Sequence, residues 1–200
     1  MPASQKKRPH ADGESDASAP PVRKGAKMAP RSADAPRADD DCVWRVARSP
    51  IGTLSLCASD AGVVELHFAP QDAPLSPPPR TPRERQADAW LARVVEHLAA
   101  ASRSPLQLPL DLRRGTLFQR RVWAAMCAVP PGETTTYGAL AKALASSPRA
   151  VGQAVGRNPV GIVQPCHRVC AGGGKLGGFA WGPDAKRALL RCEGVEPPPE

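Results

Sequence analysis

The chain has no apolar run long enough to cross a lipid bilayer, and its N-terminus carries no hydrophobic signal segment. Membrane insertion is therefore not expected. Its cysteines form no CxxC pair and no regular framework, so a disulfide scaffold is not indicated either. A reducing intracellular compartment is the expected setting. The six cysteines are Cys42, Cys57, Cys127, Cys166, Cys170 and Cys192.

Residues 1–41 lack aromatic side chains and contain a single branched aliphatic residue, Val22. Such a segment cannot bury enough apolar surface to offset the entropy lost on ordering, so we predict a disordered tail. Two basic patches, Lys6-Lys7-Arg8 and Arg23-Lys24, fit a DNA contact or an address signal, although a solvated linker is the commoner interpretation.

Positive charge gathers toward the C-terminus. Residues 115–200 carry ten basic and five acidic side chains, whereas residues 1–114 carry 17 and 14. This excess favours an anionic partner such as nucleic acid, but a basic surface that only confers solubility would have the same composition.

Residues 42–114 are predicted to form a small scaffold domain. Three short β-rich runs at 43–47, 53–58 and 63–68 are separated by turn-forming residues, a pattern typical of an antiparallel meander. A capping box at 81–84 and apolar residues at helical spacing predict an amphipathic helix over 82–101. Its apolar positions are Ala87, Trp90, Leu91, Val94 and Leu98. His67 and His97 lie inside these elements and are interpreted as packing or surface residues.

Residues 115–200 are predicted to form a second, mainly helical domain. A capping box at 116–119 opens a helix with Phe118, Val122, Ala125 and Met126 on one face. A short helix from about Tyr137 to Leu144 and another between Ser147-Pro148 and Asn158-Pro159 give the outline of a helix-turn-helix. The outline alone is weak evidence, because many small helical domains contain such a pair.

The second helix of this pair is smooth in the sense that it carries almost only small apolar side chains. One arginine, Arg149, precedes Ala150, Val151, Gly152, Ala154 and Gly156. A helix that reads bases in the major groove presents long polar side chains, whereas a slim helix with one arginine suits a minor groove. Tight packing against another helix would explain the small residues equally well.

A cysteine in an unusual setting follows. Cys166 stands between Pro165 and His167, whose imidazole is expected to lower the pKa of the thiol directly or through a water molecule. The thiolate is the reactive form of cysteine. The neighbouring Cys170 and Cys192 lack the spacing that makes zinc persuasive, so no metal is expected. A glycine-rich loop at 172–182 follows and would let a planar ligand lie against backbone groups.

These motifs resemble the O6-alkylguanine-DNA alkyltransferase family, also called methylated-DNA–protein-cysteine methyltransferases. The resemblance is carried by short motifs in the family's order and spans about residues 42–194. The motifs are RVW, PPGETTTYGALA, RAVGQA, GRNP, PCHRV, GGFAWG and LLRCEG. It implies an α+β fold, with a small antiparallel-sheet, ribonuclease H-like domain followed by a winged helix-turn-helix-like domain.

The resemblance also implies roles for the catalytic residues. Cys166 would accept the alkyl group, and His167 would act on its thiol through a water molecule. Glu193 would hold the imidazole in orientation, and Asn158 would brace the turn that carries the cysteine. Tyr137 would contact both the rotated phosphate and the flipped guanine.

Further residues are assigned to DNA and to the base pocket. Arg149 would enter the duplex where the extruded base had been, on a helix face that includes Ala150 and Gly152. The carbonyls of Cys166 and Val169 and the amide of Ala180 would face the base, and Lys186 matches a lysine typical of the family. Position 180 is a serine in many members, which matters little if only its amide is used.

The implied activity is repair of O6-alkylguanine in double-stranded DNA without a cofactor. The protein would turn the damaged nucleotide out of the duplex and transfer its alkyl group irreversibly to Cys166, one lesion per molecule. A monomer in the bacterial cytoplasm is expected, and the basic tail leaves a nuclear location open. A zinc site found in some animal members is not carried over, because only Cys42 could match its ligands.

Three other functions compete with this one. A binding protein that flags alkylated guanine without repair would lack the acceptor cysteine, and Cys166 is present. A transcriptional regulator would need a second, metal-binding DNA domain, for which the tail has no cysteines. A cysteine hydrolase would leave the smooth helix and the basic C-terminal region unexplained.

Overall fold

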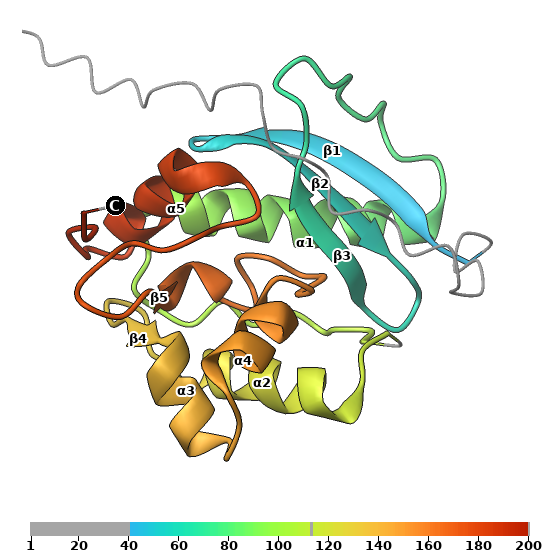
Figure 1. The fold of residues 1–200 in the computed structure, drawn as a ribbon. Coiled ribbons are helices and arrows are strands. Elements are labelled where there is room, and N and C mark those ends of the chain that lie inside the picture. The colour runs from blue at the N-terminus through green and yellow to red at the C-terminus, as the bar shows by residue number, and fades with distance from the viewer. Residues whose placement is uncertain (1–40, 113, 200) are drawn as a thin grey trace, which may run out of the picture.

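The computed structural model describes residues 41–112 and 114–199 (Figure 1). All but the last residue of the predicted tail lies outside these ranges. Within them, three strands and one long helix form the N-terminal half, and shorter helices form the C-terminal half. No helix in these ranges combines the length and apolarity that a membrane span requires.

The N-terminal half is built on a three-stranded antiparallel sheet. Its strands are β1 (Val43–Ser49), β2 (Gly52–Ala58) and β3 (Val63–Phe68), hydrogen-bonded in that order. Gly52 has a φ of 132°, a conformation that glycine adopts readily in the tight turn between β1 and β2. The predicted meander is therefore confirmed.

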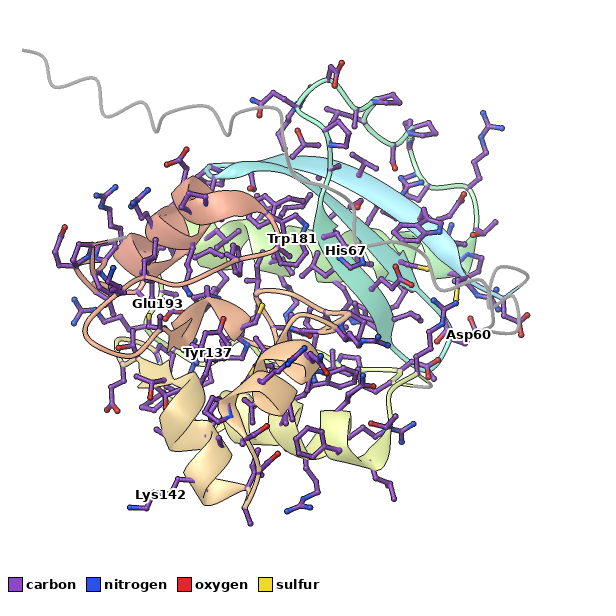
Figure 2. All side chains as sticks on the ribbon, viewed as in Figure 1. Asp60, His67, Tyr137, Lys142, Trp181 and Glu193 are labelled. Atoms are coloured by element: carbon purple, nitrogen blue, oxygen red, sulfur yellow. The ribbon has the colours of Figure 1, made fainter. Side chains whose placement is uncertain are left out.

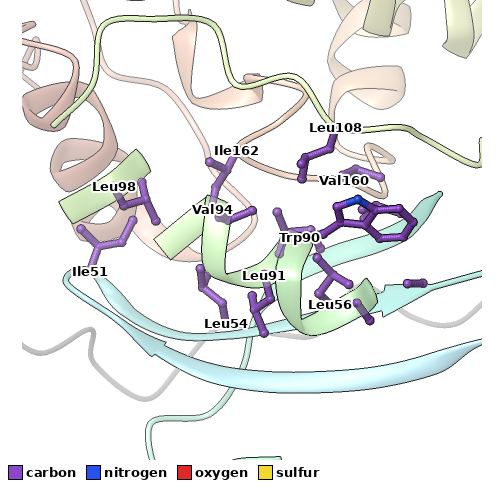
Figure 3. Close-up of a cluster of buried hydrophobic side chains, with 14 of the residues drawn as sticks. Ile51, Leu54, Leu56, Trp90, Leu91, Val94, Leu98, Leu108, Val160 and Ile162 are labelled. Carbon is purple, nitrogen blue, oxygen red and sulfur yellow. The ribbon is translucent and has the colours of Figure 1, made fainter. Parts of the chain in front are cut away.

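Helix α1 (Pro82–Ala99) packs against this sheet (Figure 3). At its start the Thr81 side chain accepts from the Glu84 amide, and the Glu84 carboxylate accepts from the Thr81 amide. This is the predicted capping box, and it satisfies amide groups that a helix start leaves free. The five predicted apolar positions of α1 are all buried against strand residues such as Leu54 and Leu56.

A segment of the C-terminal half extends the sheet. The Leu66 amide donates to the Pro159 carbonyl at 2.9 Å, and the Gly161 amide donates to the Leu66 carbonyl at 3.1 Å. Val160 and Ile162 complete the same apolar core (Figure 3). The chain just before Cys166 is therefore paired to β3, while the division at residues 114 and 115 into two domains stays a prediction.

The C-terminal half begins with α2 (Leu117–Cys127), which opens with the predicted Thr116–Gln119 capping box. Trp123 is buried under α4 (Pro148–Val155), where its indole donates to the Ala154 carbonyl at 2.9 Å. The predicted face of α2 is confirmed, since Val122 and Met126 are buried while Phe118 and Ala125 are partly buried.

Helix α3 (Tyr137–Ala143) precedes α4 across a short turn, as predicted. The Ser147 side chain accepts from the Ala150 amide at the start of α4. Helix α4 ends at Val155, a little before the predicted end near Asn158-Pro159, because the amides of Arg157 and Asn158 form shorter turn bonds.

Four elements were not predicted. A two-residue parallel pair joins β4 (Thr135–Thr136) to β5 (Val169–Cys170), and the 3₁₀ turn η1 (Cys166–Arg168) leads directly into β5. Helix α5 (Gly182–Cys192) closes the fold, and its Leu189 joins the core beneath the sheet. The β4–β5 pairing and the hydrogen bond between His167 and Glu193 bring η1, β4 and the end of α5 to one place.

Candidate functional site

Cys166 lies at the end of a braced turn. The Asn158 side chain spans this turn, because its Nδ2 donates to the Gln164 carbonyl at 2.8 Å and its Oδ1 accepts from the Val160 amide at 3.1 Å. Within the turn Ile162 has a φ of 71°, a left-handed conformation that is costly for a β-branched residue. The surrounding bonds and packing therefore hold a strained backbone just before the cysteine.

Cys166 is buried, with only 6% of the residue exposed. Burial raises its pKa to about 11, although hydrogen bonding with Asn158 and the positive charge of Lys186 act in the opposite direction. The sequence had suggested a thiol acidified by the neighbouring imidazole, but desolvation dominates in the folded protein. At neutral pH the resting cysteine therefore carries its proton, and a base must remove it before the sulfur can react.

His167 is buried and paired with Glu193. Its Nε2 lies 2.9 Å from Oε1 of Glu193. Burial opposes ionisation of the carboxyl, but the hydrogen bonds from His167 and Arg168 outweigh it and lower the pKa of Glu193 to about 2. An ionised carboxylate only accepts, so Nε2 carries the proton and Nδ1 of neutral His167 offers a lone pair.

That lone pair has no partner among the described residues, since Nδ1 is buried without a hydrogen bond. Burial also lowers the pKa of His167, while the Glu193 carboxylate raises it. A neutral imidazole with a free Nδ1, one residue from the thiol, is a suitable proton acceptor.

Arg168 completes this cluster and was missed by the sequence reasoning. Its guanidinium donates to both carboxylate oxygens of Glu193, with Nε at 2.9 Å and Nη2 at 2.7 Å, and its Nη1 donates to the Val129 carbonyl at 2.6 Å. Such a bidentate pair fixes the carboxylate in one plane. The PCHRV motif was the available signal, because it places Arg168 directly beside His167.

Lys186 is fully buried under the glycine-rich loop. Its ammonium group donates to the carbonyls of Val169 at 2.6 Å, Leu176 at 2.7 Å and Gly178 at 3.5 Å. Burial lowers its pKa, and the nearby thiols oppose this effect. Lys186 thus holds the loop to η1 and β5, and one carbonyl predicted to face a base, that of Val169, already accepts from it.

Tyr137 joins the helix pair to the same loop. Its hydroxyl donates to the Gly178 carbonyl at 3.4 Å, and a Cβ added to Gly152 of α4 would lie 3.8 Å from its ring (Figure 2). Burial raises the pKa of Tyr137, as do the thiols of Cys166 and Cys170. The tyrosine therefore stays protonated at neutral pH and lies between α4 and the loop near the thiol.

The remaining predicted residues lie outside the buried cluster. Arg149 and Ala180 are exposed, and Ala150 is half-buried beside a hollow of about 180 Å³ between α2 and α4. The structure therefore brings together most of the predicted catalytic and pocket residues. It leaves Arg149 on the surface, at the start of α4.

Trp181 is a further residue that the sequence reasoning did not assign. Its ring centroid lies 5.8 Å from that of His67 on β3 and 5.2 Å from that of Phe179 in the loop (Figure 2). A Cβ on Gly161 would lie 2.7 Å from the indole, so only glycine allows this approach. Trp181 therefore fixes the loop against the turn that carries Cys166.

The arrangement defines a class of protein. A recessed thiol, a neutral base of fixed tautomer and a loop of small residues suit transfer of a group from a flat ligand to the cysteine itself. Among the described residues, no three His, Cys, Asp or Glu side chains gather in a way that could hold a metal ion.

Comparison with known proteins narrows this class. The family model described as "6-O-methylguanine DNA methyltransferase, DNA binding domain" matches residues 117–195. The methylated-DNA–protein-cysteine methyltransferase of Mycolicibacterium paratuberculosis is 41% identical over 155 residues, which cover 75% of this chain and 91% of that protein. The protein of the same name from Methanosarcina acetivorans is 35% identical, with 76% and 97% covered.

The chain therefore belongs to the methylated-DNA–protein-cysteine methyltransferase family, as its motifs predicted. A solved structure agrees with this conclusion. The crystal structure of Mycobacterium tuberculosis OGT in complex with DNA is similar, with a TM-score of 0.64 and 36% identity, and the match covers 75% of this chain and 91% of that chain. This likeness confirms an α+β fold with a small antiparallel sheet and several helices.

Proposed function

We propose that this protein repairs O6-alkylguanine in double-stranded DNA by moving the alkyl group onto Sγ of Cys166. The observation that carries the proposal is the single cluster of Cys166, His167 and Glu193, in which a buried thiol adjoins an imidazole of fixed tautomer. Membership of a family named for transfer to a protein cysteine supports the same assignment.

His167 acts as the base in this reaction. The thiol is protonated at rest. As the damaged guanine approaches, Nδ1 of His167 takes the thiol proton through a water molecule. The imidazolium that forms is stabilised by the Glu193 carboxylate at 2.9 Å from Nε2. Arg168 keeps that carboxylate ionised and correctly turned, although its own positive charge works against the imidazolium.

The transfer itself is a substitution at the alkyl carbon. A bond forms between Sγ and that carbon while the bond between the carbon and O6 of guanine breaks, and the guanine takes up a proton. Tyr137, which is protonated and near the thiol, supplies a donor for the charge that develops on the departing base. The thioether product has no leaving group that water or His167 can displace, so each molecule acts once.

The glycine-rich loop forms one wall of the base pocket. Lys186 and Trp181 hold it against β5 and the Cys166 turn, and this support leaves backbone groups such as the amide of Ala180 available to the base. Asn158 keeps the turn, and therefore the sulfur, in place from the other side. These residues position the reacting atoms rather than exchange protons.

The helix pair α3–α4 serves as a winged helix-turn-helix-like DNA-binding unit, beside an N-terminal half of ribonuclease H-like type. Its slim second helix enters the minor groove, where the exposed Arg149 fills the space of the extruded nucleotide while Ala150 and Gly152 allow close approach. The net charge of +8 favours this contact with an anionic duplex. The protein acts as a monomer, in two domains, in the cytoplasm.

The test is a stoichiometric transfer assay. The protein is incubated with duplex DNA carrying one O6-methylguanine, and its peptides are analysed by mass spectrometry. We expect one added methylene-equivalent mass on the peptide containing Cys166, one lesion repaired per molecule, and no transfer in Cys166→Ser.

Cys170→Ser is the matched control, because Cys170 is another buried thiol four residues away. It should keep most of the transfer activity. Methylation of any other cysteine, or repair of several lesions by each molecule, would overturn the proposal.

A further inference from the structure

A small cavity lies behind the His167–Glu193 pair. Three aliphatic side chains form part of its lining, and the other residues lining it are His97, Ser102, His167, Cys192 and Glu193. Its volume is about 10 Å³. This is about the space that the centre of one water molecule needs, and a buried water also needs two to four polar partners. The cavity offers both the space and the partners.

Residues of both halves of the molecule line this cavity. His97 lies in the last turn of α1 and Ser102 just beyond it, whereas Glu193 caps the end of α5 and His167 belongs to η1. Arg103 of the same N-terminal segment also packs on Gly194, where a Cβ would collide with its guanidinium. The end of α1 therefore encloses the carboxylate that orients His167.

His97 is half-buried and faces a strongly charged neighbourhood. From the end of α5 it meets Glu193 and Cys192, and from η1 it meets His167 and Arg168. Burial lowers the pKa of His97, and the Glu193 carboxylate acts in the opposite direction. At neutral pH its imidazole is therefore uncharged and can both donate and accept a hydrogen bond.

The charge on His97 affects how readily His167 accepts a proton. When His167 takes the proton of Cys166, a cation forms beside Arg168, which already disfavours it. A second cation at His97 would disfavour it further, because like charges in a poorly solvated site repel strongly. A neutral His97 leaves the base strength of His167 intact.

We propose that His97 is a positioning residue for the transfer reaction, holding one water molecule against Glu193 and His167 and remaining neutral so that His167 can accept the thiol proton. This inference rests on the proposed function. It assigns a role in the chemistry to a residue of the N-terminal half, through Glu193 and His167 rather than by contact with the DNA base.

Two variants separate the parts of this role. His97→Gln keeps a neutral hydrogen-bonding side chain that cannot be protonated, and His97→Leu removes hydrogen bonding altogether. Rates of methyl transfer from duplex DNA are measured under single-turnover conditions across pH, with thermal unfolding of each variant as the check on folding. Glu96→Gln, an exposed change in the same helical turn, is the matched control.

At neutral pH we expect His97→Gln to react within about twofold of the wild type. His97→Leu should be slower by roughly tenfold, which is less than the ~10²-fold or more that a general base itself supplies. On acidification the wild-type rate should fall more steeply than that of His97→Gln, because only the wild type gains the second cation. Glu96→Gln should follow the wild type throughout.

Two results would overturn the inference. In one, His97→Leu reacts within twofold of the wild type at every pH. In the other, both variants lose the same factor and keep the wild-type pH profile, which means that His97 only fills space. If the wild type methylates Cys166 in these assays, the proposed function stands and the role of His97 alone is lost. If it does not, the proposed function itself fails.

A second measurement uses the wild-type protein and so does not depend on variants that fold. The chain has only four histidines, so their imidazole NMR signals can be followed individually through a pH titration. We expect the signal of His167 to shift as His97 gains its proton. A His167 signal that is unmoved at that pH contradicts the proposed coupling.

Discussion

The two halves of this molecule differ in how many polar side chains they bury. Between the sheet and α1 the core is almost wholly aliphatic (Figure 3). Around Cys166 the interior is mixed: an apolar cluster that includes Val122, Trp123 and Met126 lies beside buried polar groups. Six of the nine buried polar residues in the described ranges lie between Asn158 and Glu193. The six are Asn158, Gln164, His167, Arg168, Lys186 and Glu193.

This difference separates what holds the fold together from what performs the reaction. Aliphatic burial stabilises in proportion to the area removed from water and tolerates exchange of similar shapes. A buried ion pair contributes little net stability, yet removal of one partner is severe because the other charge stays buried. The polar interior near Cys166 therefore indicates selection for geometry and charge rather than for stability.

The largest effect should come from Glu193→Ala, which breaks the polar cluster at its centre. Arg168 and His167 would lose their shared acceptor while still buried, which costs about 3–5 kcal/mol in the free energy of unfolding. His167 would also lose its fixed tautomer, so we expect transfer to fall by at least ~10²-fold. Urea unfolding and the transfer assay measure the two losses. A stable variant with normal activity would contradict the account of the cluster.

Leu54→Ala makes a comparable change in the other half. Leu54 is fully buried, and the cavity left behind should lower the free energy of unfolding by about 2–5 kcal/mol. The transfer rate of the remaining folded protein should stay within about twofold of the wild type. Leu75→Ala is the control, since Leu75 is 51% exposed, and it should change neither quantity. If the transfer rate of Leu54→Ala fell by more than the loss of folded protein explains, the separation of the aliphatic core from the reaction would be contradicted.

Acid should act on the polar cluster in two stages. His167 and His97 have lowered pKa values, so the unfolded chain binds their protons first and stability begins to fall below about pH 6.5. The pKa of Glu193 is lowered to about 2, so the stability that its ionised carboxylate contributes is present above an unfolded pKa of about 4.3 and is lost as the pH falls toward 2.

The difference in the free energy of unfolding between wild type and Glu193→Gln measures this second stage. We expect that difference to shrink between about pH 4.5 and pH 2, because protonation makes the wild-type carboxyl resemble the amide. A difference that stays constant over this range would mean that the Glu193 carboxylate is not stabilised as the structure indicates.

Much of the fold was predictable because local patterns and tertiary packing agree here. The capping boxes at Thr81 and Thr116 and the apolar spacing of α1 each fix an element without reference to distant residues. Family membership was predictable from motifs such as PCHRV and is confirmed by the relatives. The role of Cys166 as acceptor and of His167 as its base stays a proposal.

The contacts that join distant segments were not predictable. Arg168 contacts Glu193 and Trp181 contacts His67, both far away in the sequence. Helical or strand periodicity does not indicate such contacts. His97 was interpreted as a packing or surface residue because its neighbours in α1 say nothing about η1 or α5. The acidity of Cys166 was also misjudged, since the burial that raises its pKa is a property of the folded protein.

Through the hydrogen bonds of Leu66 with Pro159 and Gly161, the N-terminal half holds the turn that carries Cys166. Separating the two halves would remove these two hydrogen bonds and would take Val160 and Ile162 out of the apolar core that they share with the sheet. The C-terminal half alone would still contain every motif of the family. It would lack the sheet that holds the sulfur of Cys166 in position.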